Sequence, residues 1–114
     1  METHSKKADL LPGTLEMLIL KTLDRNPDPM HGYGIAHYIK QISNEVLRVE
    51  EGSLYPALQR LMVKGWVETE WAQSENNRRA RYYSLTRLGR KQLARETADF
   101  ERLLEGIMRI MQPA

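Results

Sequence analysis

The sequence predicts a mainly α-helical fold that carries one small β-hairpin and ends in a long helix. Three observations lead to this prediction. Apolar residues recur at helical spacing in three successive segments, two short segments rich in β-forming residues follow, and residues 88–111 again repeat apolar side chains at steps of four and three. A chain of 114 residues is long enough for one hydrophobic core and too short for two.

The first two helices are predicted over residues 14–24 and 33–43. Their apolar positions are Leu15, Leu18 and Ile19 in the first helix and Ile35, Ile39 and Ile42 in the second. The motif NPDP at residues 26–29 separates the two helices, because proline cannot continue a helix and disfavours helical geometry in the residue before it.

The third helix is predicted over residues 51–61, the stretch EGSLYPALQRL, with Gly65 as its C-terminal stop. Its apolar stripe consists of Leu54, Leu58, Leu61 and Met62. Ser53 is the expected N-cap, which would place Pro56 at the third helical position. There the missing amide hydrogen of proline costs little, because the first-turn amides have no acceptor within the helix.

Residues 66–73 and 80–86 are predicted to form the two strands of a hairpin with a polar tip. Alternation places Val67, Thr69 and Trp71 on one face of this hairpin. The final helix, of about 24 residues, would be roughly 36 Å long. Its apolar seam consists of Leu93, Thr97, Phe100, Leu104, Ile107 and Met111. A body of about 80 residues cannot cover such a seam, so we expect a second chain to cover it.

Three helices followed by a hairpin and a long helix are the order of a winged helix-turn-helix with an added dimerisation helix. We therefore expect a winged helix DNA-binding domain over residues 10–87 and a C-terminal dimerisation helix over residues 88–112. The charges agree with this interpretation. The net charge is +2, and residues 76–91 hold six Lys or Arg and no acid. Such a run is often only a solvated surface, but a basic hairpin beside a helix suits nucleic acid.

Within the third helix, the residues expected to face solvent and DNA are Ser53, Tyr55, Pro56, Gln59, Arg60 and Lys64. Gln59 and Arg60 can donate to base edges, and Lys64 can contact a phosphate. A serine cap carries no charge that would repel DNA at the helix end, and Tyr55 and Pro56 offer contacts to sugars or thymine methyl groups. The alternative for Tyr55 is simple packing against the neighbouring helix.

Further DNA contacts are expected from the hairpin and from the second helix. Arg78, Arg79 and Arg81 flank the polar tip and can follow the phosphate backbone or enter the minor groove. His37 and Lys40 are expected on the exposed face of the second helix, close to the DNA backbone.

The sequence offers little for catalysis or metal binding. It has no cysteine, His4 stands apart, and His31 and His37 are six residues apart rather than the three or four that place two histidines on one helical face. Ser53 has no histidine or acid partner at a recognisable spacing, and no Gly-rich phosphate loop occurs. The chain also has no signal peptide and no membrane-spanning run. We therefore expect a cytoplasmic protein that is not an enzyme and uses no cofactor or metal.

Several aromatic and methionine side chains allow two interpretations. They are Trp66, Trp71, Phe100, Met108 and Met111. At a dimer seam such side chains can line a pocket for a flat apolar ligand, because thioethers adapt their shape. More often a stripe of this kind is simple core, and the sequence leaves both interpretations open.

Four stretches together resemble the PadR family of bacterial transcriptional regulators. They are LLPGTLEMLILKTL, MHGYGIAHYI, EGSLYPALQRLMVKGWV and RRARYYSLTRLGRKQL. The resemblance covers about residues 10–111, and the short C-terminal helix is similar to that of the smaller subfamily. The combination of G[ST]LYPAL with R-x-YYSLT, in this order and spacing, is more specific than either piece alone.

The resemblance implies a homodimeric repressor that binds a roughly palindromic operator, with the third helix in the major groove and the wings on flanking DNA. Two-fold symmetry would place the two reading helices about 34 Å apart. The resemblance also implies that the last helix packs on helix one of the partner. The expected dimerisation residues are Leu11, Leu15, Leu93, Phe100, Leu104, Ile107, Met108 and Met111.

Two further questions stay open at this stage. Some members of the family release DNA when phenolic or multidrug ligands bind at the dimer interface, which leaves open a small apolar or aromatic effector. Winged helices also serve as docking surfaces, so the alternative function is a protein-interaction module without DNA binding.

Overall fold

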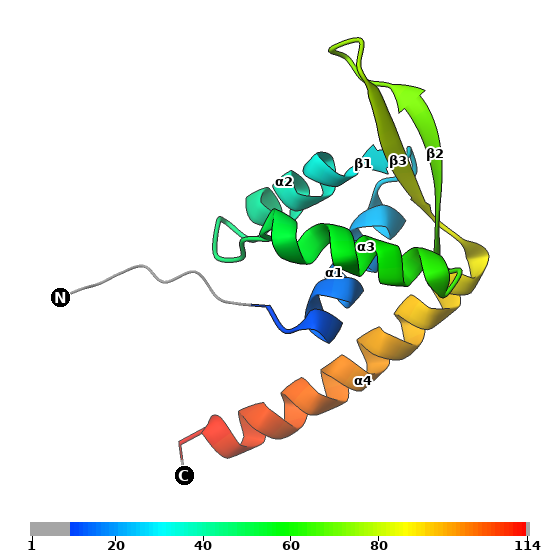
Figure 1. Cartoon of the computed structure of the whole chain (residues 1–114). Coiled ribbons are helices and arrows are strands. Elements are labelled where there is room, and N and C mark those ends of the chain that lie inside the picture. Colours follow the sequence, from blue (N-terminus) through cyan, green and yellow to red (C-terminus); the bar gives the residue numbers. More distant parts are fainter. Residues whose placement is uncertain (1–9, 114) are drawn as a thin grey trace, which may run out of the picture.

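Four helices and a three-stranded antiparallel sheet make up the fold (Figure 1). The structure is a computed structural model that describes residues 10–113, so His4 lies outside the described residues. The elements are α1 (Pro12–Arg25), β1 (Met30–His31), α2 (Gly32–Ile42), α3 (Glu51–Val63), β2 (Val67–Gln73), β3 (Arg79–Leu85) and α4 (Arg87–Met111). The predicted winged helix with a long C-terminal helix is confirmed.

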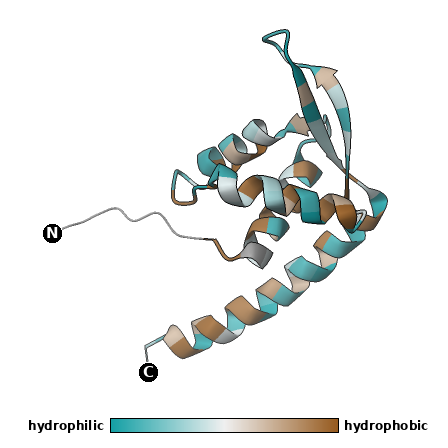
Figure 2. Ribbon diagram, in the orientation of Figure 1, coloured by the Kyte–Doolittle hydropathy of each residue, from teal (hydrophilic) through white to brown (hydrophobic). Residues whose placement is uncertain are grey.

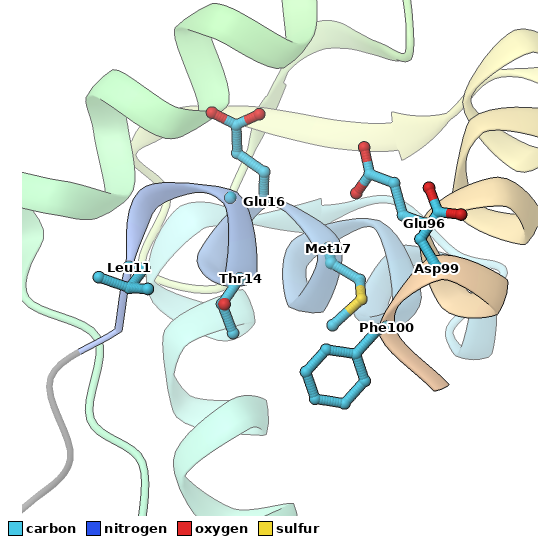
Figure 3. Close-up of a pocket in the computed structure, with 8 residues that line it drawn as sticks. Leu11, Thr14, Glu16, Met17, Glu96, Asp99 and Phe100 are labelled. Atoms are coloured by element: carbon cyan, nitrogen blue, oxygen red, sulfur yellow. The ribbon is translucent and has the colours of Figure 1, made fainter. Parts of the chain in front are cut away.

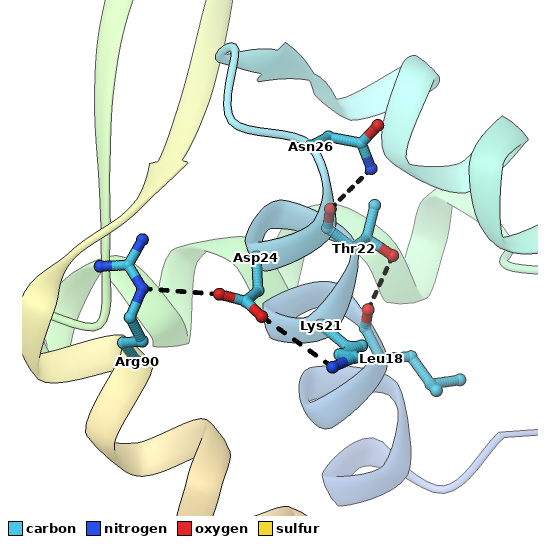
Figure 4. A network of polar contacts seen from close by, with 6 residues as sticks. All are labelled: Leu18, Lys21, Thr22, Asp24, Asn26 and Arg90. Atoms are coloured by element: carbon cyan, nitrogen blue, oxygen red, sulfur yellow. Dashed lines mark hydrogen bonds and ion pairs between the residues drawn. The ribbon is translucent and has the colours of Figure 1, made fainter.

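Helix α1 is the central element of the fold. It begins at Pro12, earlier than predicted, because the fixed backbone angle of proline suits the first helical position. It ends at Arg25, where the side chain of Asn26 donates to the Thr22 carbonyl at 2.7 Å (Figure 4). The hydroxyl of Thr22 donates in turn to the carbonyl of Leu18 at 2.8 Å.

The hydrophobic core lies where α1 meets the other helices and the sheet. Its buried members are Leu15, Ile19, Leu20, Leu23, Ile35, Ile39, Leu54, Ala57, Leu58, Leu61, Val67, Tyr83 and Leu93. Helices α1, α2 and α3 supply most of them, which matches the stripes read from the sequence. The core therefore stabilises the three-helix body and leaves most of α4 outside it.

The sheet contains one strand more than the sequence predicts. Its order is β1-β3-β2, with Met30 opposite Tyr83 and His31 opposite Tyr82. A strand of two residues is too short to show alternation, so β1 gave no sequence signal. The predicted hairpin of β2 and β3 is confirmed, and its tip turns through Asn77, whose φ of 60° suits asparagine.

Helix α2 begins with a histidine cap that the sequence did not predict. The Nδ1 atom of His31 accepts a hydrogen bond from the backbone N–H of Gly34 at 3.0 Å. The His31 ring also stands edge-on to Tyr82, with ring centroids 5.6 Å apart. His31 thus connects the start of α2 to the sheet.

The predicted N-cap of α3 is wrong. The helix begins at Glu51 with Glu50 at the N-cap position, and Ser53 lies inside the first turn. Pro56 consequently lies within the helix, where it cannot donate to the carbonyl of Gly52. Two carboxylates, rather than an uncharged serine, therefore stand at the N-terminal end of α3.

Helix α4 is anchored firmly at its N-terminal end only. The Thr86 hydroxyl accepts from the N–H of Gly89 at 2.9 Å and donates to the carbonyl of Gly65 at 2.7 Å. Arg90 pairs with Asp24 of α1 at 3.5 Å, as Figure 4 shows. From Ala98 to Pro113 every residue is exposed, and Figure 2 shows apolar positions along this outer part of the helix.

Candidate nucleic-acid interface

Helix α3 presents a polar outer face. Its buried residues are Leu54, Ala57, Leu58 and Leu61. All six predicted reader residues are exposed: Ser53, Tyr55, Pro56, Gln59, Arg60 and Lys64. Val63, which was not among the predicted readers, is 77% exposed and lies one turn after Gln59 on the same face. An exposed valine there can contact a thymine methyl group.

Arg60 and Lys64 are not isolated on the surface. The Nε atom of Arg60 donates to Oε2 of Glu16 on α1 at 2.5 Å, and Nζ of Lys64 lies 3.7 Å from Oε1 of the same carboxylate. The ammonium group of Lys64 also lies 4.7 Å from the ring centroid of Trp66. The Glu16 carboxylate therefore orients the side chains of both Arg60 and Lys64, and the Trp66 ring adds a second contact for Lys64.

Tyr55 combines the two roles considered from the sequence. A Cβ atom added to Gly32 would come within 2.8 Å of the Tyr55 ring, so the ring packs closely against the start of α2. Yet Tyr55 is 45% exposed and can still contact a ligand. Burial raises the pKa of the Tyr55 phenol above its usual value, with Tyr83 and Glu51 acting in the same direction. The phenol therefore remains a neutral hydrogen-bond donor at physiological pH.

The β2–β3 hairpin is the wing of this fold, and the Trp71 ring lies against two of its arginines. Trp71 stands opposite Arg81 in the β2–β3 register. The guanidinium groups of Arg79 and Arg81 lie 5.0 and 5.2 Å from the centroid of its ring, within cation–π range. Arg78 is exposed at the tip. The predicted strand ranges set no register between the two strands, so the sequence placed neither arginine over the Trp71 ring.

The two cationic candidates of α2 lie close to the start of α3. His37 is exposed and Lys40 is half-buried. Both line a hollow that also contains Arg48 and Glu50, in the segment that leads into α3. They extend the polar surface of α3 toward α2, whereas the wing extends it in the direction of β2 and β3.

The expected dimerisation residues separate into two groups. Leu15 and Leu93 are buried in the core of the protomer, with 2% and 5% exposure, so they stabilise the protomer itself. The others are exposed: Leu11, Phe100, Leu104, Ile107, Met108 and Met111. Leu103 and Ile110 are exposed as well and were missed, because they flank the predicted seam. The outer part of α4 thus carries many exposed apolar side chains, and Figure 2 shows the apolar positions along its ribbon.

A pocket of about 350 Å³ lies between α1 and the outer part of α4 (Figure 3). Met17 and Phe100 form its apolar side, and Glu96 and Asp99 add carboxylates, whereas the Glu16 carboxylate pairs with Arg60 and Lys64. The other aromatic and methionine candidates do not line it: Trp66, Trp71, Met108 and Met111. Within residues 10–113, no group of three or more His, Cys, Asp or Glu side chains could hold a metal ion. None of the described helices is long and apolar enough to cross a membrane.

Solved structures of known proteins share this fold. A transcriptional regulator from Clostridium thermocellum superposes with a TM-score of 0.81 at 25% identity, covering 92% of this chain and 100% of that one. A PadR-like transcription factor from Bacteroides fragilis gives a TM-score of 0.69 at 31% identity, covering 87% and 91% of the two chains.

A comparison of sequences gives two further similar proteins. An uncharacterized protein of Lysinibacillus sphaericus is 27% identical over 108 residues, which is 90% of this chain and 94% of that protein. A protein in transposon Tn4556 of Streptomyces fradiae is 40% identical over 88 residues, which is 77% of this chain but only 23% of that protein.

The family profile covers the part of the chain that contains α3 and the β2–β3 hairpin. The description "Transcriptional regulator PadR-like family" applies to the profile that matches residues 19–95, more than half of the chain. The match includes α2, α3, both strands of the hairpin and the anchored start of α4. With the winged helix architecture and the similar solved structures, this match shows that the chain belongs to the PadR-like family of transcriptional regulators.

Proposed function

We propose that this protein is a homodimeric repressor that binds a pseudo-palindromic operator in double-stranded DNA. The exposed face of α3 carries the proposal, because it presents Gln59, Arg60 and Val63 beside a hairpin in which Arg79 and Arg81 lie over the Trp71 ring. Side chains of these types read base edges, whereas wing arginines meet phosphates or the minor groove. Such a protein represses by occupying DNA, needs no catalytic step, and works in the cytoplasm.

The carboxylates at the start of α3 refine the expected contacts. Glu50 and Glu51 oppose a phosphate at this helix end, which is otherwise a favourable anion site. We therefore assign phosphate contacts to Lys64 and the wing, and base contacts to the residues from Gln59 onward. Ser53 becomes a secondary contact in this arrangement.

Dimerisation is supported by the apolar surface on α4. Side chains such as Phe100, Leu104 and Ile107 are 39%, 45% and 46% exposed on a helix that leaves the body of the protomer. A patch of this extent on a soluble domain is usually an interaction surface. A second copy that packs its α1 here, as the family resemblance implies, gives a two-fold dimer with two reading helices about one turn of DNA apart.

The function is tested by binding of the purified protein to the DNA upstream of its own gene, with a scrambled duplex of equal length as control. At physiological salt we expect a preference of about a thousandfold or more for the upstream DNA. Equally weak binding to both duplexes, and to duplexes selected from random sequence, would favour the protein-interaction alternative. Size measurement of the protein in the same buffer gives its oligomeric state.

The wing and the reading helix should respond differently to substitution. Arg79→Ala should weaken binding to the operator and to the scrambled duplex alike, and should reduce the slope of log affinity against log salt by about 1. Gln59→Ala should leave that slope unchanged but alter the preferred base at one position of each half-site. Titrations over a range of salt concentrations distinguish the two effects. Identical behaviour of both variants would contradict the assignment.

The pocket between α1 and α4 bears on the question of an effector. Its carboxylates favour a small aromatic molecule with a positive charge over a purely apolar one. We expect such a compound to lower operator affinity in the wild type, and to do so less in Phe100→Ala. A fluorescence competition titration against the bound operator measures the effect. Equal responses of both proteins would place any effector elsewhere.

A further inference from the structure

A buried carboxylate joins α1 to the reading helix. Glu16 is 8% exposed and is the one charged residue among those buried within residues 10–113. A carboxylate removed from water requires a cation or hydrogen bonds, since an unpaired buried charge carries a large free-energy cost. Glu16 finds its partners at the C-terminal end of α3: Arg60, 44 residues away in the sequence, and the C-cap residue Lys64.

The carboxylate contacts two cations of α3 at once. Its Oε2 accepts from Nε of Arg60 at 2.5 Å, and its Oε1 lies 3.7 Å from Nζ of Lys64. These two cations are four residues apart on one helix surface, where like charges repel each other unless a carboxylate lies between them. Figure 3 shows the Glu16 carboxylate directed away from Met17 and Phe100, toward the ribbon of α3.

This arrangement uses one edge of the Arg60 guanidinium and leaves another for DNA. Glu16 takes the Nε donor, and within residues 10–113 the two terminal nitrogens of Arg60 make no hydrogen bond. The Arg60 side chain is 44% exposed, so these nitrogens can reach a ligand. Two terminal nitrogens are the donors that contact O6 and N7 of guanine. Ordering the side chain before DNA binds lowers the entropy lost on binding.

We propose that Glu16 is a positioning residue for DNA recognition, which directs the terminal nitrogens of Arg60 to a guanine and holds Lys64 beside it for a phosphate. This inference rests on the proposed DNA-binding function. The carboxylate should affect specific and non-specific DNA affinity in opposite directions. A negative charge near DNA weakens non-specific attraction, while a correctly placed arginine strengthens recognition, so Glu16 increases the ratio of specific to non-specific affinity.

The test is Glu16→Gln, which keeps the shape of the side chain and removes its charge. We expect the preference for the operator over the scrambled duplex to fall by roughly fivefold or more. A change of about fivefold corresponds to the lower end of the base discrimination that a bidentate arginine contact provides. Affinity for the scrambled duplex should stay equal or rise. The lost discrimination should map to the base pair that Arg60→Ala no longer reads. In the Arg60→Ala background, Glu16→Gln should cause no further loss of discrimination.

Two controls separate positioning from stability. Glu96→Gln removes the same charge from the pocket between α1 and α4, where the Glu96 carboxylate accepts from Gln92 at 2.8 Å, and should leave the base preference unchanged. Glu16→Asp keeps the charge but withdraws the carboxylate by one methylene group, so it should lose discrimination at the same base pair with an unchanged salt slope. It also provides the test if Glu16→Gln does not fold, which thermal unfolding shows.

The outcomes distinguish this inference from the proposed function. If the wild type prefers an operator and both Glu16 variants keep that preference at every base pair, the inference is overturned. A further loss of discrimination in the Arg60→Ala background also overturns it, because Glu16 would then act without Arg60. If the wild type itself prefers no duplex, the proposed function fails instead.

Discussion

Replacing Gly89 with alanine should lower the midpoint of thermal unfolding by about 8 °C or more, which corresponds to roughly 2 kcal/mol of lost stability. The reason is the close approach of α4 to the end of the α3–β2 turn. A Cβ atom at Gly89 would lie 2.0 Å from the carbonyl oxygen of Trp66 and 2.8 Å from Cδ1 of Leu85. A backbone oxygen cannot move aside as a flexible side chain can, so the start of α4 must shift.

That shift should disturb the contacts that anchor α4. Thr86 donates its N–H to the Trp66 carbonyl at 3.1 Å and its hydroxyl to the Gly65 carbonyl at 2.7 Å. Because α4 is the proposed dimerisation helix, its direction sets the separation of the two reading helices. We therefore expect Gly89→Ala to weaken operator binding more than binding to scrambled DNA, even below the unfolding temperature.

Gly106→Ala is the matched control for Gly89→Ala. Gly106 lies on the exposed part of the same helix, and a Cβ atom there would meet nothing within 4 Å. This substitution should stabilise α4 by about 0.5–1 kcal/mol, since glycine is a poor helix former. Calorimetry or circular dichroism on both variants gives the comparison. Equal midpoints for the two variants would show that the backbone at Gly89 tolerates a side chain.

Replacing Leu104 with aspartate should break the proposed dimer and abolish tight operator binding. Leu104 is 45% exposed in the protomer and lies within the apolar surface of α4. Two-fold symmetry brings the new carboxylate into the interface twice, and each buried unpaired charge costs several kcal/mol. We expect the dissociation constant of the dimer to rise by about a hundredfold or more. Sedimentation equilibrium over a range of protein concentrations measures it.

Ala98→Asp is the control for the effect of a new carboxylate on α4. Ala98 is exposed on the same helix, and at 100° per residue it lies about 120° around the axis from Leu104. The helix should tolerate aspartate there at a cost of less than about 1 kcal/mol, with the mass in solution unchanged. If Leu104→Asp also keeps the mass of the wild type, α4 does not form the interface.

Sequence periodicity predicted most elements, and the errors share a physical cause. Every predicted helix and the hairpin exist, because their apolar stripes repeat at the spacing of one buried face. The N-cap of α3 was misassigned, because Ser53 has the chemistry of a cap but Glu50 occupies the cap position. Leu15 and Leu93 were assigned to the dimer although they complete the protomer core. An apolar stripe shows that its residues are buried, but it does not show whether the same chain or a second chain covers them.

In the candidate site, too, the exposure of single residues could be predicted, but the contacts between distant residues could not. The types and exposure of Gln59, Arg60 and Lys64 could be predicted, because helical geometry alone turns them away from the apolar stripe. The stacking of Arg79 on Trp71 and the pairing of Glu16 with Arg60 could not be predicted, since each needs the positions of two segments in space. Residues that act through a distant partner leave no periodic signal.

By itself, the sequence determined the order of the four helices and the hairpin, the basic wing, the exposed apolar seam of the last helix and the resemblance to the PadR family, since all of these depend on residues close together in the chain. Only the tertiary structure decided which residue caps α2, how β1 completes the sheet, and which carboxylate holds Arg60. Those contacts arise when packing of α1, α3 and the sheet around one core brings distant polar groups within hydrogen-bonding distance. Local patterns thus encode the elements, and the packed core selects the contacts that orient the proposed DNA-reading side chains.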